Sequence, residues 1–201
     1  MSDLKVIDGG DQPLFPLQRL VFPGIAIPMR IFEQRYLRLV REALAAGSGF
    51  GVVPILAGRE VGATPTIAPL GTWVQIVDWS TLPNGLLGIE IRGERRLRVG
   101  ATRVEADGLM RGEVTLLAEE VPLALAEDDA DLVGLLGELA RELGVAERYL
   151  GADLDGGQLT WRLADLLPVP LVDKLALLEL DDPAARLALV RRWVWGLAQQ
   201  R

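Results

Sequence analysis

The stretch LFPLQRLVFPGIAIPMRIFEQRYLRLV, residues 14–40, predicts two short strands followed by the start of a helix. The apolar runs PLFPL (residues 13–17) and IAIPM (residues 25–29) are brief and contain proline, which favours short strands over helices. After residue 31, apolar residues recur at three- and four-residue spacing until Gly47, so residues 32–46 are predicted to form a helix. Its expected apolar stripe is Leu37, Val40, Ala43 and Leu44.

Further along the chain, short apolar runs separated by glycine and proline predict at least five more strands. The runs are FGVVPIL, GTWVQIVDW, LLGIEIRG, ERRLRVGATRVEA and LMRGEVTLLAEE, and Asn84-Gly85 is a hairpin-turn signal. The second of these strands is apolar on both faces, so Trp73 and Trp79 are expected to be core residues. Residues 11–120 should therefore form a curled antiparallel sheet with one helix.

The second half of the chain, residues 128–200, is rich in leucine and alanine and predicts a bundle of helices. Helical patterns cover residues 132–143, 159–167 and 171–180, and a fourth helix is expected to start at Asp181–Pro183. The two prolines of LLPVP must separate the second of these helices from the third. An acidic, proline-containing connection places the boundary between the halves near residues 120–128.

The composition excludes several classes of function. The chain has no cysteine and no histidine, so disulfides, thiolate metal sites, histidine-based triads and ordinary catalytic zinc are unavailable. Its net charge of -7 opposes binding to a polyanionic backbone. No run of about 18 apolar residues occurs, and the first residues lack a signal-peptide pattern. A cytoplasmic protein with no membrane partner and no cofactor is expected.

Residues 14–40 resemble the N-terminal signature of the Lon protease substrate-binding domain. The resemblance continues through VVPI, GTWVQIVDW, PNGLLGIEIRG and ERRLRV, and then through WRLADLLPVPLVDKLALLEL and DDPAARLALV. It implies an α+β fold in which a PUA-like antiparallel pseudo-barrel is followed by a helical bundle. The strand and helix patterns described above lead to the same division into a sheet half and a helical half.

The resemblance also implies what a bacterial protein of this kind would bind. Members recognise unfolded or tagged polypeptide, so a polypeptide substrate or a partner protein is the expected ligand, and an ATP-dependent protease is one such partner. No catalytic activity is expected, because the sequence has no GxxxxGK[ST] phosphate-binding loop. Nor does a serine motif of the Ser-Lys peptidase type appear among three serines and two lysines.

Candidate binding residues come from the signature and from the last helix. Four apolar residues of the signature are expected to line a shallow surface between the two halves, with a core role as the alternative: Phe22, Ile25, Met29 and Phe32. Trp195 falls among charged residues of the final helix, where it either contacts a partner or packs on neighbouring arginines. The charged centre of the signature is interpreted as structural, with peptide contact as the alternative: Arg30, Glu33, Arg35 and Tyr36.

Two other functions remain as alternatives. A PUA-like RNA-binding module is suggested by the basic run from Glu94 to Arg103, although charge pairing with Glu90 and Arg92 across a tight turn explains that run and no aromatic residues interleave it. A hydrolase using carboxylates alone would need a facing pair of acids that the sequence does not identify. The acidic clusters at residues 127–131 and 153–155 lack the EF-hand pattern, so no metal is expected.

Overall fold

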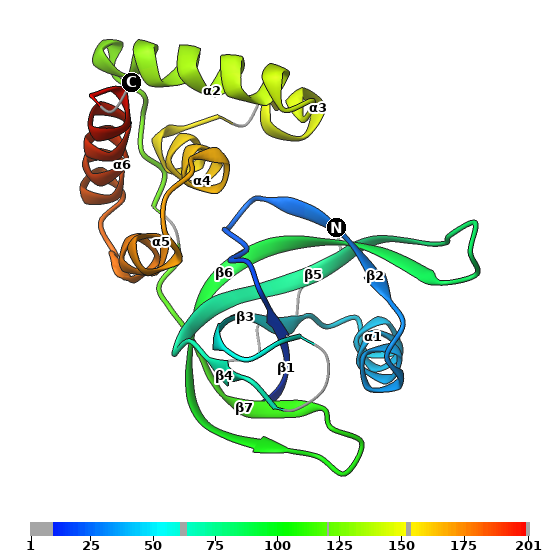
Figure 1. The fold of residues 1–201 in the computed structure, drawn as a ribbon. Helices are drawn as coiled ribbons and strands as arrows, with labels where there is room; N and C mark the ends of the chain where they lie inside the picture. Colours follow the sequence, from blue (N-terminus) through cyan, green and yellow to red (C-terminus); the bar gives the residue numbers. More distant parts are fainter. Residues whose placement is uncertain (1–9, 61–63, 120, 152–153, 200–201) are drawn as a thin grey trace. The chain divides into compact units, whose positions relative to one another are not determined.

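A computed structural model describes residues 10–60, 64–119, 121–151 and 154–199 of the chain. The fold is α+β, as predicted, with a seven-stranded sheet in the first half and helices in the second (Figure 1). Contacts divide the chain into two units. Unit 1 holds the residues up to Val21 together with Ala26–Leu117, and unit 2 holds Phe22–Ile25 together with the residues from Ala118 onward.

Five strands of unit 1 close into a ring. The pairing order is β1-β7-β6-β5-β3, and β3 pairs back onto β1. The β1–β3 pair is parallel, whereas every other pair in the described residues is antiparallel. The strands are β1 (Asp11–Leu17), β2 (Ala26–Ile31), β3 (Phe50–Ala57), β4 (Thr66–Ile67), β5 (Leu70–Thr81), β6 (Leu87–Val104) and β7 (Met110–Leu116).

Each strand of the ring sends apolar side chains into the core of the barrel. The cluster consists of Leu14, Val53, Trp73, Leu97, Val99, Met110 and Val114. These side chains are removed from water together, which is the main stabilising contribution in a fold of this size. Gly51 lies against this cluster, and a Cβ atom there would come 2.7 Å from the Leu14 side chain.

The β6 strand differs from the sequence prediction. Two strands joined by a tight turn were expected on either side of Glu94, but β6 runs without interruption from Leu87 to Val104. In place of a turn, the pairing of β5 with β6 shifts its register after Trp73 and after Ile76. Glu90 and Arg92 therefore lie on the same strand as the basic run, so the predicted charge pairing across a turn is wrong.

The register shifts also separate the two tryptophans of β5. Trp73 is buried, as predicted, but Trp79 is 60% exposed, so its predicted core position is wrong. A regular strand would place both residues on one face, whereas an extra residue between Ile76 and Asp78 changes the alternation. Trp79 lies opposite Ile89, near the end of the β5–β6 hairpin.

Helix α1 (Gln34–Ala46) is the one long helix among the described residues of unit 1, and it ends at Gly47 in the left-handed conformation. Its buried residues are Tyr36, Leu39, Val40 and Ala43. This stripe is rotated from the predicted one, because Leu44 is exposed and Leu39 is fully buried. The first turn of α1 thus presents Tyr36 to the barrel.

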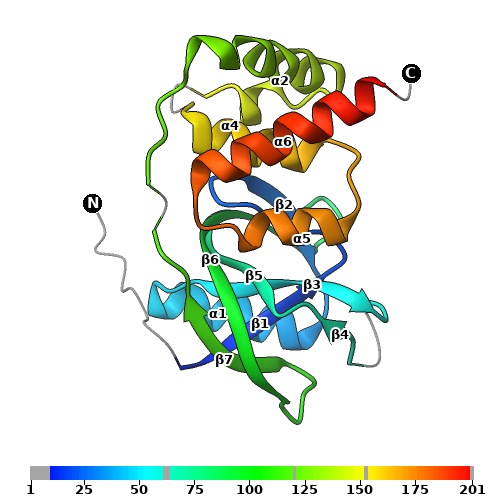
Figure 2. The same cartoon turned by 90° about the vertical axis from the view of Figure 1, so that its left-hand side faces the viewer.

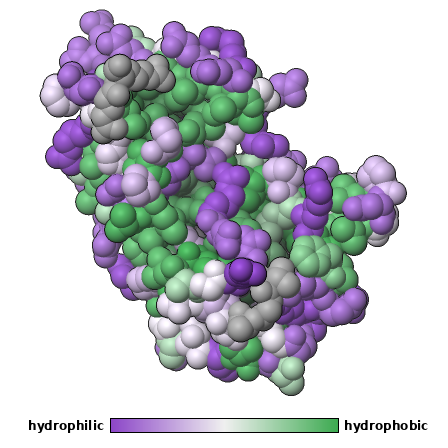
Figure 3. All heavy atoms as spheres, in the orientation of Figure 1, coloured by the Kyte–Doolittle hydropathy of each residue, from purple (hydrophilic) through white to green (hydrophobic). Residues whose placement is uncertain are grey.

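Unit 2 contains the four predicted helices and one additional short helix. They are α2 (Ala130–Glu142), α3 (Ala146–Tyr149), α4 (Gly156–Leu166), α5 (Leu171–Glu179) and α6 (Pro183–Ala198), preceded by the 3-10 turn Glu127–Asp129. Helix α6 packs on α4 (Figure 2). The outer side of α2 is mostly hydrophilic (Figure 3), as expected of a helix with one buried face.

The centre of unit 2 is a fully buried tryptophan between an aromatic ring and a cation. Trp161 of α4 stacks on Phe22 with ring centroids 5.4 Å apart, and the Arg186 guanidinium of α6 lies 4.5 Å from the Trp161 ring. Arg186 also donates hydrogen bonds to the carbonyl oxygens of Leu180 and Asp181, at 2.7 and 3.1 Å. Residues 22–25 are therefore part of this core.

Candidate functional site

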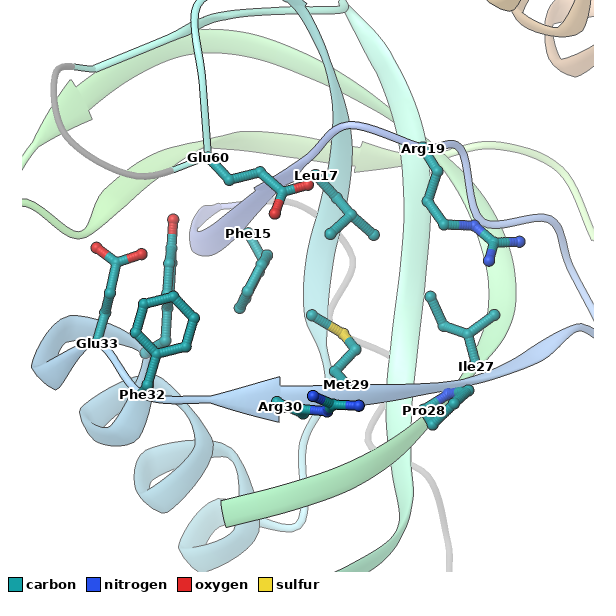
Figure 4. Close-up of a pocket in the computed structure, with 11 residues that line it drawn as sticks. Phe15, Leu17, Arg19, Ile27, Pro28, Met29, Arg30, Phe32, Glu33 and Glu60 are labelled. Carbon is teal, nitrogen blue, oxygen red and sulfur yellow. The ribbon is translucent and has the colours of Figure 1, made fainter. Parts of the chain in front are cut away.

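A pocket of about 190 Å³ opens in unit 1 between β1, β2 and the start of α1 (Figure 4). Its apolar lining combines residues of β1 and β2 with the exposed ring of Phe32, and charged side chains lie around it. The lining residues are Phe15, Leu17, Arg19, Ile27, Pro28, Met29, Arg30, Phe32, Glu33, Tyr36 and Glu60. An apolar centre with a few polar groups is the usual composition of a binding site.

Aromatic side chains form the back of the pocket. Phe15 and Tyr36 are both buried, and their rings stack with centroids 4.0 Å apart. Burial raises the pKa of the Tyr36 hydroxyl to about 12, so this group is a neutral phenol at physiological pH. The hydroxyl makes no hydrogen bond to any residue within the described ranges. It is therefore a polar group of the pocket that is available to a ligand.

The start of α1 is held in place by Arg35. Its guanidinium pairs with Glu33 at 2.8 Å and donates to the carbonyl oxygens of Gly108 and Glu60, at 2.9 and 3.1 Å. It also lies 4.7 Å from the centre of the Tyr36 ring. One side chain thus joins the helix entry to two loops.

Charges of opposite sign lie at opposite ends of the pocket. Glu33 extends beside Phe32 at the α1 end, Glu60 extends over Phe15 and Leu17, and Arg19 lies at the other end, across from Ile27 (Figure 4). Glu60 accepts a hydrogen bond from the backbone N–H of Gln18 at 2.7 Å, through one of its two oxygens. Each carboxylate has further acceptor positions for a ligand.

The structure separates the predicted binding residues into three groups. Met29 and Phe32 both line the pocket, and Phe32 is 54% exposed. Phe22 and Ile25 are buried in unit 2, which leaves their side chains closed to a ligand and corrects their expected place on a binding surface. Trp195 is 70% exposed on α6.

Sequence reasoning assigned a structural role to three residues that line the pocket: Arg30, Glu33 and Tyr36. It missed Phe15, Leu17, Arg19, Ile27, Pro28 and Glu60. Phe15 and Leu17 lie two residues apart in the predicted strand of the signature, so their common face was open to inference. Glu60 approaches from a loop distant in sequence, and no local pattern points to it.

The basic run of β6 is only partly exposed. Arg96 is buried, and Arg95 donates a hydrogen bond to the carbonyl oxygen of Leu117 at 2.7 Å. Arg103 pairs with Asp11 at 2.6 Å. Three of the arginines considered for RNA contact are thus engaged within unit 1.

Asp129, one of the acidic residues near the start of α2, has structural partners. Asp129 accepts a hydrogen bond from the backbone N–H of Ala126 at 2.8 Å and pairs with Arg191 at 2.6 Å. In the described part of the chain, no three acidic side chains gather in a way that could hold a metal ion. Asp153 lies outside the described residues. None of the described helices is both long and apolar enough to span a membrane.

Two solved structures with this fold are N-terminal domains of Lon-type proteins. The chain is similar to the Lon N-terminal domain protein from Xanthomonas campestris, with 37% identity and a TM-score of 0.72, over 92% of this chain and 98% of that one. The N-terminal domain of the Mycobacterium avium complex Lon protease shares the fold, with a TM-score of 0.59 at 21% identity, over 92% of this chain and 97% of that one. The expected pseudo-barrel followed by a helical bundle is confirmed.

The family model for the ATP-dependent protease La (LON) substrate-binding domain matches residues 12–194. The chain belongs to this family. Among curated proteins it is 25% identical to a Lon protease of Cytophaga hutchinsonii over 87% of this chain, and 30% identical to Lon protease 1 of Sorangium cellulosum over 84%. It spans 22% of the length of each of these proteases.

Proposed function

We propose that this chain is a non-catalytic module that recognises segments of polypeptide, either in a substrate or in a partner protein, and that the pocket of unit 1 is its recognition site. The single observation that carries the proposal is the composition of that pocket. An apolar centre formed by Phe15, Leu17 and Met29 suits a large apolar side chain, and the flanking charges suit a polar main chain and neighbouring residues.

Membership of the Lon substrate-binding family supports polypeptide as the ligand class. The volume of the pocket supports the same choice. About 190 Å³ is below the usual range for sites that enclose a whole cofactor or drug-sized molecule, about 300–1,000 Å³. A pocket of this size matches one or two side chains of a longer ligand whose remainder lies outside it.

Binding of an unfolded polypeptide tests the proposal. The probe is fluorescein-labelled lactalbumin that has been reduced and carboxymethylated so that it stays unfolded, and the readout is fluorescence anisotropy at physiological salt. The double variant Met29→Ala/Phe32→Ala removes two pocket side chains. We expect its affinity for the probe to fall at least about tenfold, since each lost apolar contact is worth about 1 kcal/mol or more.

Val172→Ala provides a matched control, because Val172 is an apolar side chain on α5 that is 71% exposed and lies outside the pocket. It should leave the affinity within about twofold of wild type. Thermal unfolding of each variant verifies that the fold is retained. If the wild type does not bind the probe, or if the double variant binds as tightly as the control, the pocket is not the recognition site.

Trp195 is proposed as a second contact, in unit 2. An exposed tryptophan is among the side chains that contribute most to protein interfaces. Trp195→Ala should weaken binding of the same probe by about tenfold if the ring contacts the polypeptide. An affinity equal to that of Val172→Ala would instead assign Trp195 a packing role beside its neighbouring arginines.

A further inference from the structure

Strand β2 forms an edge of the sheet beside the pocket. It pairs with residues 87–92 of β6, and those residues pair on their other side with β5. Among the described residues no strand pairs with the second edge of β2. An unpaired edge presents free N–H and C=O groups, which can accept another extended chain.

The pocket follows this free edge. Four consecutive residues of β2 line it, from Ile27 to Arg30. Successive side chains of a strand point to opposite faces, so a pocket on one face would contact only every second residue. Ile27 and Met29 are directed from β2 into the pocket (Figure 4), and contact with the intervening Pro28 and with Arg30 means that the pocket also reaches the edge of the strand.

Pro28 indicates which main-chain groups face outward. Proline has no N–H, so within a sheet it occupies an edge position with its nitrogen directed away from the paired strand. Residues two apart in a strand direct their main-chain groups to the same side. The C=O of Pro28 and both the N–H and the C=O of Arg30 therefore face away from β6, toward the pocket.

We propose, on the basis of the function proposed above, that the bound segment is extended and adds to the free edge of β2 as a further strand. One of its apolar side chains enters the pocket over Phe15, Leu17 and Met29. Four residues of β2 span about 10 Å, which is enough for three or four ligand residues. A helix does not fit this role. Its diameter of about 10–12 Å keeps its main chain away from the edge, and its N–H and C=O groups are already bonded internally.

The charges at the ends of the pocket select the residues that flank the apolar side chain. Glu33 favours a basic residue toward α1, and Arg19 favours an acidic residue toward the other end. The Tyr36 hydroxyl adds a donor within the pocket, on a side chain that is only 5% exposed. The site thus fits an extended segment with the order basic, apolar, acidic along the direction from Phe32 to Ile27.

A pair of substitutions at Arg30 separates main-chain recognition from side-chain recognition. Arg30→Pro removes the outward N–H, whereas Arg30→Ala removes the same side chain and keeps the N–H. Because that N–H takes no part in the β2–β6 ladder, both variants should fold, which circular dichroism and thermal unfolding would establish. We expect the affinity of Arg30→Pro for the carboxymethylated lactalbumin probe to be at least tenfold lower than that of Arg30→Ala.

A scan of the ligand tests the same inference without changing the protein. Twelve-residue peptides that cover the lactalbumin sequence are measured by anisotropy, and the tightest binder is remade with one N-methyl group at each position in turn. Addition to β2 predicts losses of about tenfold at alternate positions within a window of three or four residues, because alternate N–H groups face β2. Intervening positions should tolerate the methyl group.

The outcomes distinguish the two proposals. Equal affinities of Arg30→Pro and Arg30→Ala, together with an N-methyl scan that lacks a two-residue period, would overturn strand addition while Met29→Ala/Phe32→Ala still weakened binding. Failure of wild-type protein to bind the unfolded probe would overturn the proposed function itself. A two-residue period combined with a specific loss in Arg30→Pro supports strand addition.

Discussion

The Phe15 ring lies stacked on the Tyr36 ring, with centroids 4.0 Å apart and ring planes inclined by 23°. Phe15 belongs to the strand that closes the barrel, and Tyr36 belongs to the first part of the helix that follows β2. Such a stack contributes about 0.5–1.5 kcal/mol beyond the burial of the two rings. It fixes the back of the pocket before any ligand arrives, which lowers the entropy cost of binding.

The Tyr36 hydroxyl makes the stability of the folded protein fall at alkaline pH. Burial raises its pKa from 10.0 to about 12 in the folded protein, so the folded state retains its proton more tightly than the unfolded state. The resulting stability is present below about pH 10 and is lost as pH rises toward the folded pKa. Urea unfolding at about pH 9 and pH 11 measures this loss as a fall in the free energy of unfolding. In Tyr36→Phe the part of the fall that is due to the Tyr36 hydroxyl should be absent.

Absorbance at about 295 nm, where the phenolate absorbs, checks the same group directly. The chain has two tyrosines, so the difference between wild type and Tyr36→Phe isolates the Tyr36 titration. A difference curve with its midpoint near pH 10 would show that the ring is open to solvent, contrary to its burial. A midpoint near pH 12 agrees with the structure.

The ion pairs of Arg38 make the stability of the folded protein fall at acidic pH. It hydrogen-bonds Glu105 and lies 2.8 Å from Asp107. The pKa of Glu105 is lowered chiefly by the hydrogen bond from Arg38, and that of Asp107 chiefly by the backbone N–H of Leu109, with Arg38 adding to it. Lowered carboxyl pKa values stabilise the folded state above about pH 5, and this stability is lost as pH falls through the folded values.

Arg38→Gln should therefore show a smaller drop in Tm between about pH 6 and pH 3 than wild type. The effect is small and decreases with added salt, because these side chains are partly exposed. Arg41→Gln is a matched control on the exposed side of the same helix. Equal pH dependence in Arg38→Gln and Arg41→Gln would mean that the Arg38 ion pairs contribute nothing measurable in solution.

The order and type of the elements could be predicted from the sequence because they depend on local patterns. The signature segment, the turn at Gly47 and four helices of unit 2 follow from residue spacing, turn residues and prolines. The short helix α3 is too brief to give a periodic signal. The continuity of β6 was missed because Gly93 next to Glu94 has the composition of a turn, whereas the pairing with β5 leaves Glu94 of β6 and Val77 of β5 as extra residues in a continuous ladder.

The pocket could be predicted only in part. Met29 and Phe32 were identified as apolar residues of the signature, but the same reasoning chose Phe22 and Ile25, which are buried. Local spacing does not distinguish an apolar side chain that closes a core from one that lines a pocket. That distinction depends on the parallel β1–β3 pair and on the loop carrying Glu60, both of which join residues distant in sequence.

Arg186 is expected to be essential to the stability of unit 2. Its guanidinium is fully buried, satisfies two carbonyl oxygens and lies over Trp161. Arg186→Met would leave those carbonyls without their donor and remove the cation–π contact, so we expect a loss of about 3 kcal/mol in chemical unfolding. Arg192→Met, an exposed change on the same helix, should stay within about 0.5 kcal/mol of wild type.

Arg186→Lys tests whether the geometry of the guanidinium matters beyond its charge. Lysine keeps the charge but cannot reproduce the planar fork of donors. We expect a stability between those of wild type and Arg186→Met. A stability equal to that of wild type would show that charge alone is sufficient at this position.

A side chain at Gly24 is expected to be destabilising, for two reasons that can be separated. Its φ of +78° is costly for other residues, and a Cβ atom would come 2.2 Å from Oε1 of Gln158 in α4. Gly85 offers a matched comparison, since its φ is +80° and nothing lies within 4 Å of a Cβ there. Gly85→Ala should lower the free energy of unfolding by about 1 kcal/mol through its backbone conformation alone. Gly24→Ala should lower it by about 1–2 kcal/mol more.

The double variant Gly24→Ala/Gln158→Ala identifies the source of that difference. Removing the Gln158 side chain relieves the steric contact but not the backbone cost. In the Gln158→Ala background, Gly24→Ala should therefore lower the free energy of unfolding by only as much as Gly85→Ala lowers that of wild type. Chemical unfolding of all four variants measures these terms. If Gly24→Ala costs no more than Gly85→Ala, the Gln158 side chain turns aside freely, and residues 22–25 are held in unit 2 by the Phe22–Trp161 stack rather than by close packing at Gly24.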